Sequence, residues 1–334
     1  MAKKELNPDA LAICNALKIA ISLDKDANCV THDGKLITAT PVGTLYVPVD
    51  ITVGSAFKAI DMYNALNGCD KPFTHVEDSA KSTLQISWGR KRATLKTLPK
   101  VSVFVSPIDY VQNAHISEGY KEALNDFVND LIPRSNDVSS AVVAFAGYEA
   151  YWTNRQIAAK LYSATYIPEI MAYVADLKVV TAIEGNIVGI GGTDHSVTFH
   201  FDTGTAIQIP LVDKTLVYPL NALQGLFKDE LFGATYPITE EISDAIAYVS
   251  KFADSLIYLS PEHIGTHKNP SEGTAVTQDE IPLDLCFMLD MVKLGAFKKA
   301  ESLTKPSHPS PTVGFYTNKK NAKFCFVAIK EQAQ

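Results

Sequence analysis

Apolar residues recur with helical spacing in three stretches of the chain. In each stretch they occupy positions i, i+3, i+4, i+7 and i+11, which is the pattern of the buried face of an amphipathic helix. The stretches cover residues 10–21, 120–131 and 242–253 and begin 110 and 122 residues apart. The pattern therefore predicts one helix near the start of each third of the chain.

A second apolar stripe follows each of these helices, with the spacing i, i+1, i+4 and i+7. These stripes cover residues 56–63, 170–177 and 285–292. Proline precedes each stripe, at Pro48, Pro168 and Pro282. Proline suits a strand-to-helix junction because it is tolerated in the first helical turn and blocks continuation of the helix backwards. We expect a second helix at each of the three positions.

A β-hairpin is the third recurring element. In LQISWGRKRATLKTLP, residues 84–99, apolar and polar residues alternate on both sides of a GRKR turn. Similar strands flank DTGT in VTFHFDTGTAIQIPLV, residues 197–212, and TNKKN in VGFYTNKKNAKFCFVAI, residues 313–329. Three elements in the same order at matching offsets indicate an internal repeat of about 110 residues.

The repeat predicts an α+β fold of three tandem domains, at 1–110, 111–230 and 231–334. Two amphipathic helices and antiparallel hairpins in each domain should place both helices on one face of an antiparallel sheet. Three such domains in series leave unpaired strand edges at both ends. A second subunit could pair these edges by closing a ring.

Composition and charge narrow the functional classes. The chain has 334 residues, 20% of them charged, and no apolar stretch long enough to span a membrane. Five scattered cysteines without a C-x-x-C pair, and an N-terminus without an apolar run, indicate a reduced cytoplasmic protein without a signal peptide. The net charge of −7 argues against a protein that is basic all over, although a local basic patch could still bind nucleic acid.

Signals for chemistry are weak. The sequence GIGGTDHS at 189–196 lacks the glycine order of a nucleotide-binding loop, and we expect a hairpin turn there. His263 and His267 are four residues apart without a third metal ligand nearby. Nucleophile and zinc-protease motifs do not occur in the sequence. We therefore expect no enzyme activity, no catalytic residues, no metal and no cofactor.

The order and spacing of these elements resemble the bacterial DNA sliding clamp, the β subunit of DNA polymerase III. The likeness covers essentially the whole chain and is most specific in SWGRKRATLKTLP and FDTGTAIQIPLVDKTLVYP, which resemble the ends of the family's first two domains. The segment EAYWTNRQIA is similar to a Thr-Asp segment of the family, with Asn154 in place of the aspartate. The resemblance implies a processivity factor. It also implies that two subunits close head to tail into a ring around duplex DNA, without sequence specificity, and that this ring tethers the polymerase.

The chain departs from the expected basic lining of such a ring. The helix at 120–131 carries Glu122, Asp126 and Asp130, and Glu240 and Glu241 precede the helix at 242–253. These departures indicate a divergent clamp of bacterial or phage origin, acting in the cytoplasm of a bacterial cell or of a phage-infected host cell.

The resemblance and the local charge nominate residues that contact DNA phosphates. They lie on the helices, in the loops after the first helices, at the first hairpin tip and in a lysine-rich C-terminal stretch: Lys18, Lys25, Lys58, Arg90, Arg134, Asn136, Lys178, Lys293, Lys298 and Lys299. The alternative is that these are solvated surface residues or residues of turns and helix caps.

The resemblance also implies a peptide cleft between the second and third domains. Carried over position by position, its walls are Thr153, Arg155, Ile157, Pro219, Cys325, Val327 and Ile329. A mostly apolar groove suits a short peptide motif of the DNA polymerase or of the clamp loader. The alternative is that these are ordinary core residues.

A second function remains open on the sequence alone. A module with a clamp-like fold could sequester the partners of a clamp without encircling DNA. Retention on circular DNA that is lost when the circle is linearised would separate the two functions.

Overall fold

The computed structural model describes residues 7–99, 116–132, 138–213, 215–277, 287–290, 294–295, 297, 300–307, 315–319 and 322–326. The chain divides into two compact units. Unit 1 comprises Met1–Ile116 and Ala175–Leu211, and unit 2 comprises Ser117–Val174 and Val212–Gln334. The division into three domains at residues 110 and 230 stays a prediction.

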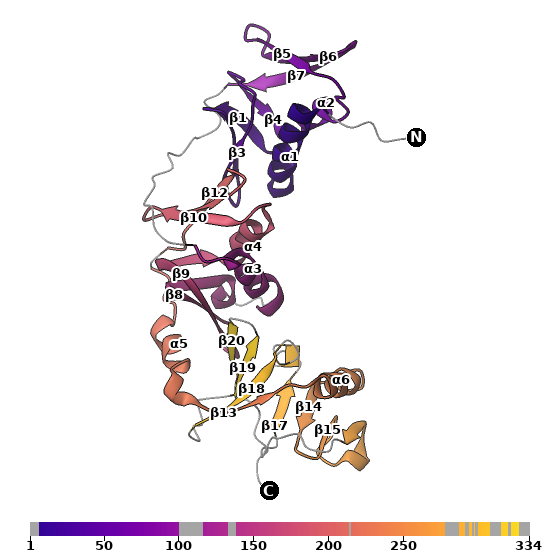
Figure 1. Ribbon diagram of the computed structural model, residues 1–334, viewed down its shortest axis with the longest axis vertical. Coiled ribbons are helices and arrows are strands. Elements are labelled where there is room, and N and C mark those ends of the chain that lie inside the picture. Colours follow the sequence, from indigo (N-terminus) through magenta and orange to yellow (C-terminus); the bar gives the residue numbers. More distant parts are fainter. Residues whose placement is uncertain are drawn as a thin grey trace. The chain divides into compact units, whose positions relative to one another are not determined.

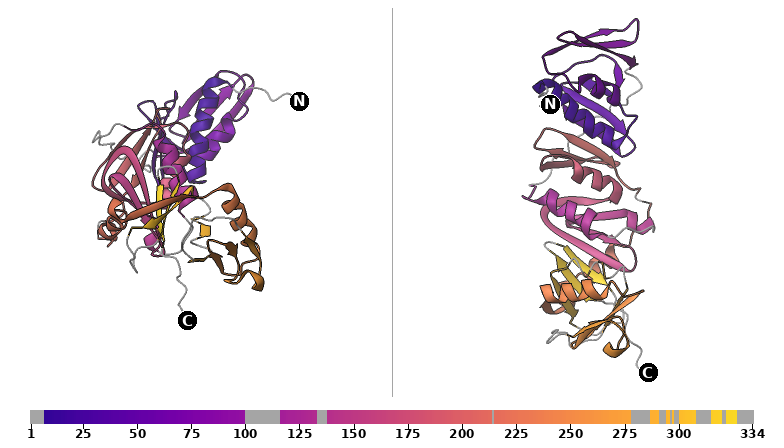
Figure 2. Two further views of the ribbon diagram at one scale, coloured as in Figure 1. Left: turned by 60° about the horizontal axis from the view of Figure 1, so that its bottom comes forward. Right: turned by 90° about the vertical axis from the view of Figure 1, so that its right-hand side faces the viewer.

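The described part of unit 1 contains three helices, α1 (Pro8–Leu23), α2 (Ala59–Leu66) and most of α4 (Val174–Ala182). Helix α1 begins at Pro8, and the Asn7 side chain caps it by accepting from the backbone N–H groups of Asp9 and Ala10. Its buried face includes Ala10, Ile13, Cys14 and Leu17, as the apolar spacing predicts. Helices α1 and α2 contact each other, and α1 packs on strands β2 and β3 (Figures 1 and 2).

The strands of unit 1 form one ten-stranded sheet in the order β10-β11-β12-β3-β2-β1-β4-β7-β6-β5, and every neighbouring pair is antiparallel. Its strands are β1 (Asn28–His32), β2 (Lys35–Thr40), β3 (Gly43–Pro48), β4 (Ala56–Lys58), β5 (Phe73–Asp78), β6 (Thr83–Trp88), β7 (Lys91–Leu98), β10 (Ile187–Gly192), β11 (Ser196–Phe201) and β12 (Ala206–Pro210). The β12–β3 ladder, with Ala206 opposite Tyr46, joins the first predicted domain to the second.

Unit 2 contains a six-stranded sheet, β13-β18-β19-β20-β9-β8, and a four-stranded sheet, β16-β15-β14-β17. The strands are β8 (Val142–Thr153), β9 (Ile157–Tyr173), β13 (Phe232–Pro237), β14 (Leu256–Leu259), β15 (His263–Gly265), β16 (Ala275–Thr277), β17 (Phe287–Asp290), β18 (Ser302–Pro306), β19 (Phe315–Lys319) and β20 (Ala322–Phe326). The β20–β9 ladder joins the second predicted domain to the third.

Unit 2 includes the helices α3 (Tyr120–Asn125), which continues as a π-helix (Asp126–Leu131), α5 (Leu220–Leu226) and α6 (Glu240–Val249). Short 3₁₀ turns cover Val138–Ala141, Asp229–Leu231 and Pro270–Glu272. Helix α6 buries Ile242, Ala245, Ile246 and Val249 of the predicted stripe and packs beside β15 and β16 (Figure 1), but it ends before the fifth member, Ala253. The α+β prediction is confirmed.

The three predicted hairpins are confirmed as β6–β7, β11–β12 and β19–β20. The first two predicted second helices are wrong in their first residues, because Ala56 and Phe57 belong to β4, and Ile170 and Met171 belong to β9. The third is wrong at Leu289, the third residue of its stripe, which belongs to β17. In the first two cases the helix starts three or four residues later, because the leading apolar pair completes a strand before the chain turns into the helix. Residues 285, 286 and 292 lie outside the described residues.

The helices of the described residues include none that is both long and apolar enough to cross a membrane.

Candidate DNA-binding and partner-binding surfaces

Five of the predicted DNA-binding residues are described, and all five lie in unit 1. Lys18 is exposed on α1, with its amine 5.9 Å from the centre of the Tyr63 ring. Lys25 is exposed in the loop after α1. Lys58 is exposed at the end of β4, where its amine lies 3.7 Å from Asp26. These side chains are accessible to a phosphate, and solvent screens the Lys58–Asp26 pair.

The other two described cations differ in accessibility. Arg90 is exposed in the two-residue turn between β6 and β7, where Gly89 takes a φ of 55°. Lys178 is partly buried on α4. Arg134, Asn136, Lys293, Lys298 and Lys299 lie outside the described residues, so their roles stay predictions.

Acidic side chains are exposed on helix α6. Glu240, Glu241 and Asp244 are all exposed at its start, where the positive end of the helix dipole stabilises negative charge. The same charges repel DNA phosphates. The acidic side chains that the sequence analysis noted before this helix are therefore surface groups.

The predicted cleft residues Thr153, Arg155 and Ile157 lie around the turn between β8 and β9. The Asn154 side chain accepts from the backbone N–H groups of Gln156 and Ile157, at 3.0 and 2.7 Å. The Thr153 hydroxyl donates to the Ile157 carbonyl at 2.9 Å, and Arg155 takes a left-handed φ of 69°. Asparagine in place of the family's aspartate keeps the turn-forming oxygen. Thr153 and Ile157 are buried, whereas Arg155 is exposed.

Two further segments meet this turn within unit 2. Strand β20 pairs with the start of β9, so that Phe326 lies opposite Ile157 and Cys325 opposite Ala158. Val327 and Ile329, which follow, lie outside the described residues. Pro219 is exposed at the start of α5. The structure thus brings the β8–β9 turn, the end of β20 and the start of α5 together within unit 2.

Helix α5 is held against the β8–β9 hairpin by an apolar cluster. Leu223 and Phe227 pack with Tyr151 and Ala158, and the Tyr151 and Phe227 ring centres are 6.3 Å apart. The Tyr218 hydroxyl lies 3.3 Å from the Tyr151 carbonyl and 3.4 Å from that of Val142. Burial raises the pKa of Tyr218, so its hydroxyl stays a neutral donor.

An ion pair beside this cluster was not foreseen from the sequence. The Lys160 amine lies 2.8 Å from a Glu149 oxygen, and the Tyr151 hydroxyl donates to the same carboxylate. The Lys160 amine also lies 5.8 Å from the centre of the Phe227 ring. The side chain of Lys160 is 12% exposed and that of Glu149 is 29% exposed, so salt screens their attraction less than at the surface, while both charges bear a desolvation cost. The Lys160–Glu149 pair depends on the register of β8 and β9, which the sequence does not show. Helix α5 could have been predicted from the sequence, because Leu220, Leu223 and Phe227 have the spacing i, i+3 and i+7.

Comparison with solved structures identifies the architecture. Caulobacter crescentus pol III beta is similar to this chain with a TM-score of 0.70 at 13% identity, covering 96% of this chain and 98% of that chain. The chain has the sliding-clamp fold. The DNA polymerase sliding clamp of Pseudomonas aeruginosa matches with a TM-score of 0.68 at 13% identity and the same coverage. The Helicobacter pylori beta clamp bound to a DNA ligase peptide matches with a TM-score of 0.70 at 12% identity, covering 96% and 99%.

No protein-family model and no curated protein matches the chain. The likeness to these clamps therefore lies in the fold, at 12–13% sequence identity. The resemblance drawn from the order and spacing of the repeats is confirmed at the level of the fold.

Proposed function

We propose that this chain is a DNA sliding clamp, a non-enzymatic processivity factor that holds a replicative polymerase on duplex DNA. The observation that carries the proposal is the clamp fold over 96% of the chain. A clamp needs no sequence-reading device, because phosphate contacts hold a protein on DNA without specifying bases. Encirclement supplies the residence time, which suits a chain with a net charge of −7 and few exposed cations on its described helices.

Ring closure by two head-to-tail subunits is part of the proposal. Among the described residues, β7 pairs with β4 only through Thr97 and Leu98, so this ladder leaves one edge of Lys91–Lys96 open. Strand β16 pairs with β15 alone among the described strands and forms one edge of the small sheet. We assign these two edges to each other across the subunit boundary, a heterologous contact that closes. The strand edges at both ends of the chain would then be paired and could not pair with other chains.

Partner binding is the second part of the proposal. The H. pylori clamp that shares this fold was solved with a DNA ligase peptide. In this chain the β8–β9 turn, the start of α5 and the end of β20 come together in unit 2. We propose that Thr153, Arg155, Ile157, Pro219, Cys325, Val327 and Ile329 contribute to a cleft there for short peptides of a polymerase and a clamp loader.

A sequestering module is the second candidate function. The exposed Glu240, Glu241 and Asp244 on α6 favour it, since they would oppose DNA on that helix. Such a module would bind clamp partners in the bacterial or phage-infected cytoplasm but would not encircle DNA.

The test that separates the two candidates uses a nicked circular plasmid. The chain is incubated with the plasmid and a bacterial clamp loader, and the retained protein is measured by gel filtration. We expect it to elute with the circle at a salt concentration that removes simple ionic binding, and to dissociate when one restriction cut linearises the DNA. Retention that ignores the cut, or no retention with a loader that loads its own clamp, would favour the sequestering module.

A further inference from the structure

Strand β8 is the last strand of the six-stranded sheet, so one of its edges has no strand partner among the described residues. The Asn154 N–H donates to the Ile157 carbonyl at 3.1 Å, which fixes the hydrogen-bonding pattern of the β8–β9 hairpin. Facing residues of an antiparallel pair alternate between those that bond to each other and those that do not. Tyr151 faces Lys160, three residues before Asn154, and therefore belongs to a non-bonded pair. Its carbonyl points away from β9, and so does the N–H of Thr153.

The Tyr218 hydroxyl satisfies these two outward groups. It donates to the Tyr151 carbonyl at 3.3 Å, and a backbone hydrogen bond from Thr153 also reaches it. The Val142 carbonyl lies slightly further away, at 3.4 Å. Burial raises the pKa of Tyr218, so the phenol stays protonated and can donate. One side chain thus covers the open edge of β8 at the place where a further strand would otherwise pair.

Tyr218 connects two residues of the proposed cleft. Thr153 is bonded to its hydroxyl, and Pro219 is the next residue in the chain. The Leu220 N–H donates to the Tyr218 carbonyl at 2.8 Å, so the backbone turns tightly between Tyr218 and the start of α5. Pro219 lies within this turn and is exposed. The position of Pro219 relative to Thr153 is therefore set through the phenol of Tyr218.

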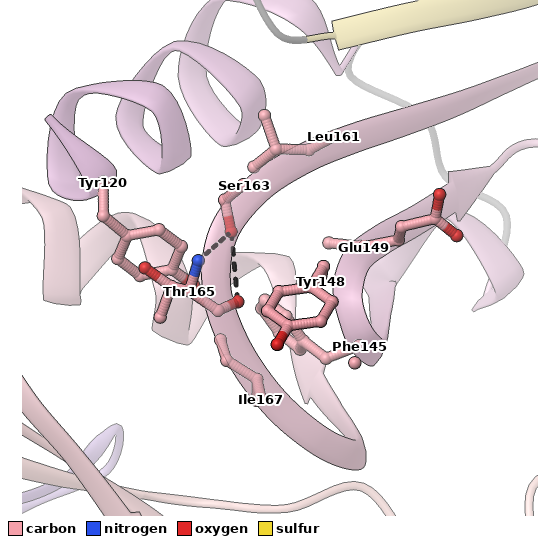
Figure 3. A pocket seen from close by; sticks show the side chains of 10 residues that line it. Tyr120, Phe145, Tyr148, Glu149, Leu161, Ser163, Thr165 and Ile167 are labelled. Atoms are coloured by element: carbon pink, nitrogen blue, oxygen red, sulfur yellow. Dashed lines mark hydrogen bonds between the residues drawn. The ribbon is translucent and has the colours of Figure 1, made fainter. Parts of the chain in front are cut away.

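The other end of α5 is held by different contacts. Phe227 packs on Tyr151 with ring centres 6.3 Å apart, and the Lys160 amine lies 5.8 Å from the centre of the Phe227 ring. Lys160 is held in turn by Glu149 at 2.8 Å. The Glu149 side chain points away from the small depression between β8 and β9 (Figure 3). Since these contacts hold the end of the helix, loss of the Tyr218 hydroxyl should release its start without releasing the whole helix.

We propose that Tyr218 is a positioning residue of the peptide cleft, whose hydroxyl fixes the wall at Pro219 relative to the wall at Thr153. This inference rests on the proposed function, because it assigns a role within the same cleft. Tyr218 acts without touching the peptide. A wall that is ordered before binding does not have to be ordered by the peptide, so less of the binding free energy is lost.

The test compares the full chain with Tyr218→Phe, which keeps the ring and removes only the hydroxyl. The probe is a fluorescein-labelled hexapeptide in which serine alternates with leucine, leucine and phenylalanine as apolar anchors, and fluorescence anisotropy measures its binding. We expect about fivefold to tenfold weaker binding to Tyr218→Phe than to the parent, because the peptide must then order the wall at Pro219.

Thr31→Val in unit 1 is the matched control. It removes a hydroxyl that donates to the Val53 carbonyl at 3.1 Å, so it also costs the protein a buried hydrogen bond. Both variants should unfold at a lower urea concentration than the parent, but Thr31→Val should leave the peptide affinity unchanged. An equal loss of affinity in the two variants would mean that the loss reflects overall destabilisation, and it would overturn the positioning role.

Deuterium exchange of the Thr153 amide, followed by NMR, measures the effect on the edge of β8 directly. The exchange should be about tenfold faster in Tyr218→Phe than in Thr31→Val, because only the former loses the oxygen that the amide bonds to. Equal exchange in the two variants would overturn the proposal. Equal peptide affinity in Tyr218→Phe and the parent would overturn it while leaving the cleft intact, whereas a parent that does not bind the peptide would overturn the cleft as well.

Discussion

Asp176, in the first turn of α4, is a carboxylate that the fold buries. Asp176 is 9% exposed, and this burial raises the pKa of its carboxyl group to about 6. The folded state therefore binds a proton more readily than the unfolded state between about pH 4 and pH 6. The contribution of Asp176 to the free energy of unfolding is most favourable below pH 4, where the group is protonated in both states. It is lost as the pH rises through 6, because the buried carboxyl must then ionise.

We predict that Asp176→Asn raises the stability at pH 8 and leaves it nearly unchanged at pH 4. The amide cannot ionise, so the cost of the buried charge, of the order of 1–3 kcal/mol, disappears. Urea unfolding of both proteins from pH 4 to pH 8 measures the effect. Parallel stability curves for the two proteins would show that Asp176 does not titrate in this range.

At the same scale, the turn chemistry of the candidate cleft could be predicted from the sequence, but its burial could not. Asparagine at 154 forms the turn in which the Thr153 hydroxyl also bonds, a local property of the residues themselves. The burial of Ile157 depends partly on β20, which lies about 170 residues away and pairs Phe326 with it. A local pattern carries no information about such a partner.

Among the elements, strand β3 begins where the backbone of its neighbour comes close. A Cβ atom on Gly43 would lie 2.1 Å from the backbone oxygen of Gln208 on β12. Alanine at this position forces the two strands apart, because the obstacle is backbone and cannot rotate away.

We predict that Gly43→Ala destabilises the protein by about 3 kcal/mol or more, the range of severe overpacking. Gly34→Ala is the control: its φ is 70° but nothing lies within 4 Å of the added atom. That substitution should cost only about 1 kcal/mol, the strain of a left-handed residue. Equal losses in thermal unfolding experiments would mean that β3 and β12 are not this close.

The elements also show where periodicity misleads. The i, i+3, i+4, i+7 stripes at α1 and α6 correctly predicted helices, because a helix is the element whose side chains repeat with that period. The i, i+1 pairs Ala56–Phe57 and Ile170–Met171 lie instead on β4 and β9. Two adjacent apolar residues fit the end of a buried strand as well as the start of a helix. The preceding prolines, Pro48 and Pro168, end β3 and lie within β9 rather than starting helices.

For the whole molecule, the proposed ring depends on the open edge of β7. Lys91, Arg92 and Lys96 are exposed there. Cations on an edge discourage pairing of two identical edges and favour an acidic partner. Glu272 is exposed before β16, and Asp279 and Glu280 follow that strand in the sequence.

We predict that the chain sediments at twice its mass of 36.4 kDa at micromolar concentration. Arg92→Glu should weaken the dimer at least tenfold, because it replaces an attractive charge by a repulsive one. Lys81→Glu, which reverses an exposed cation in the turn before β6, should leave the dimer intact. A parent chain that stays monomeric at all accessible concentrations would contradict the prediction, and so would equal dimer affinity in Arg92→Glu and the parent.

The β12–β3 ladder has a consequence for synthesis on the ribosome. The outer edge of β3 is complete at Pro48, but its partner begins at Ala206. At roughly 5–20 residues per second, the ribosome needs about 8–30 s to make the chain between them. During that interval the nascent chain carries an unpaired strand edge. Nascent chains on neighbouring ribosomes could pair with each other through this edge of β3. A chaperone that covers the edge, or slower translation initiation that spaces the ribosomes further apart, would therefore raise the yield of folded protein.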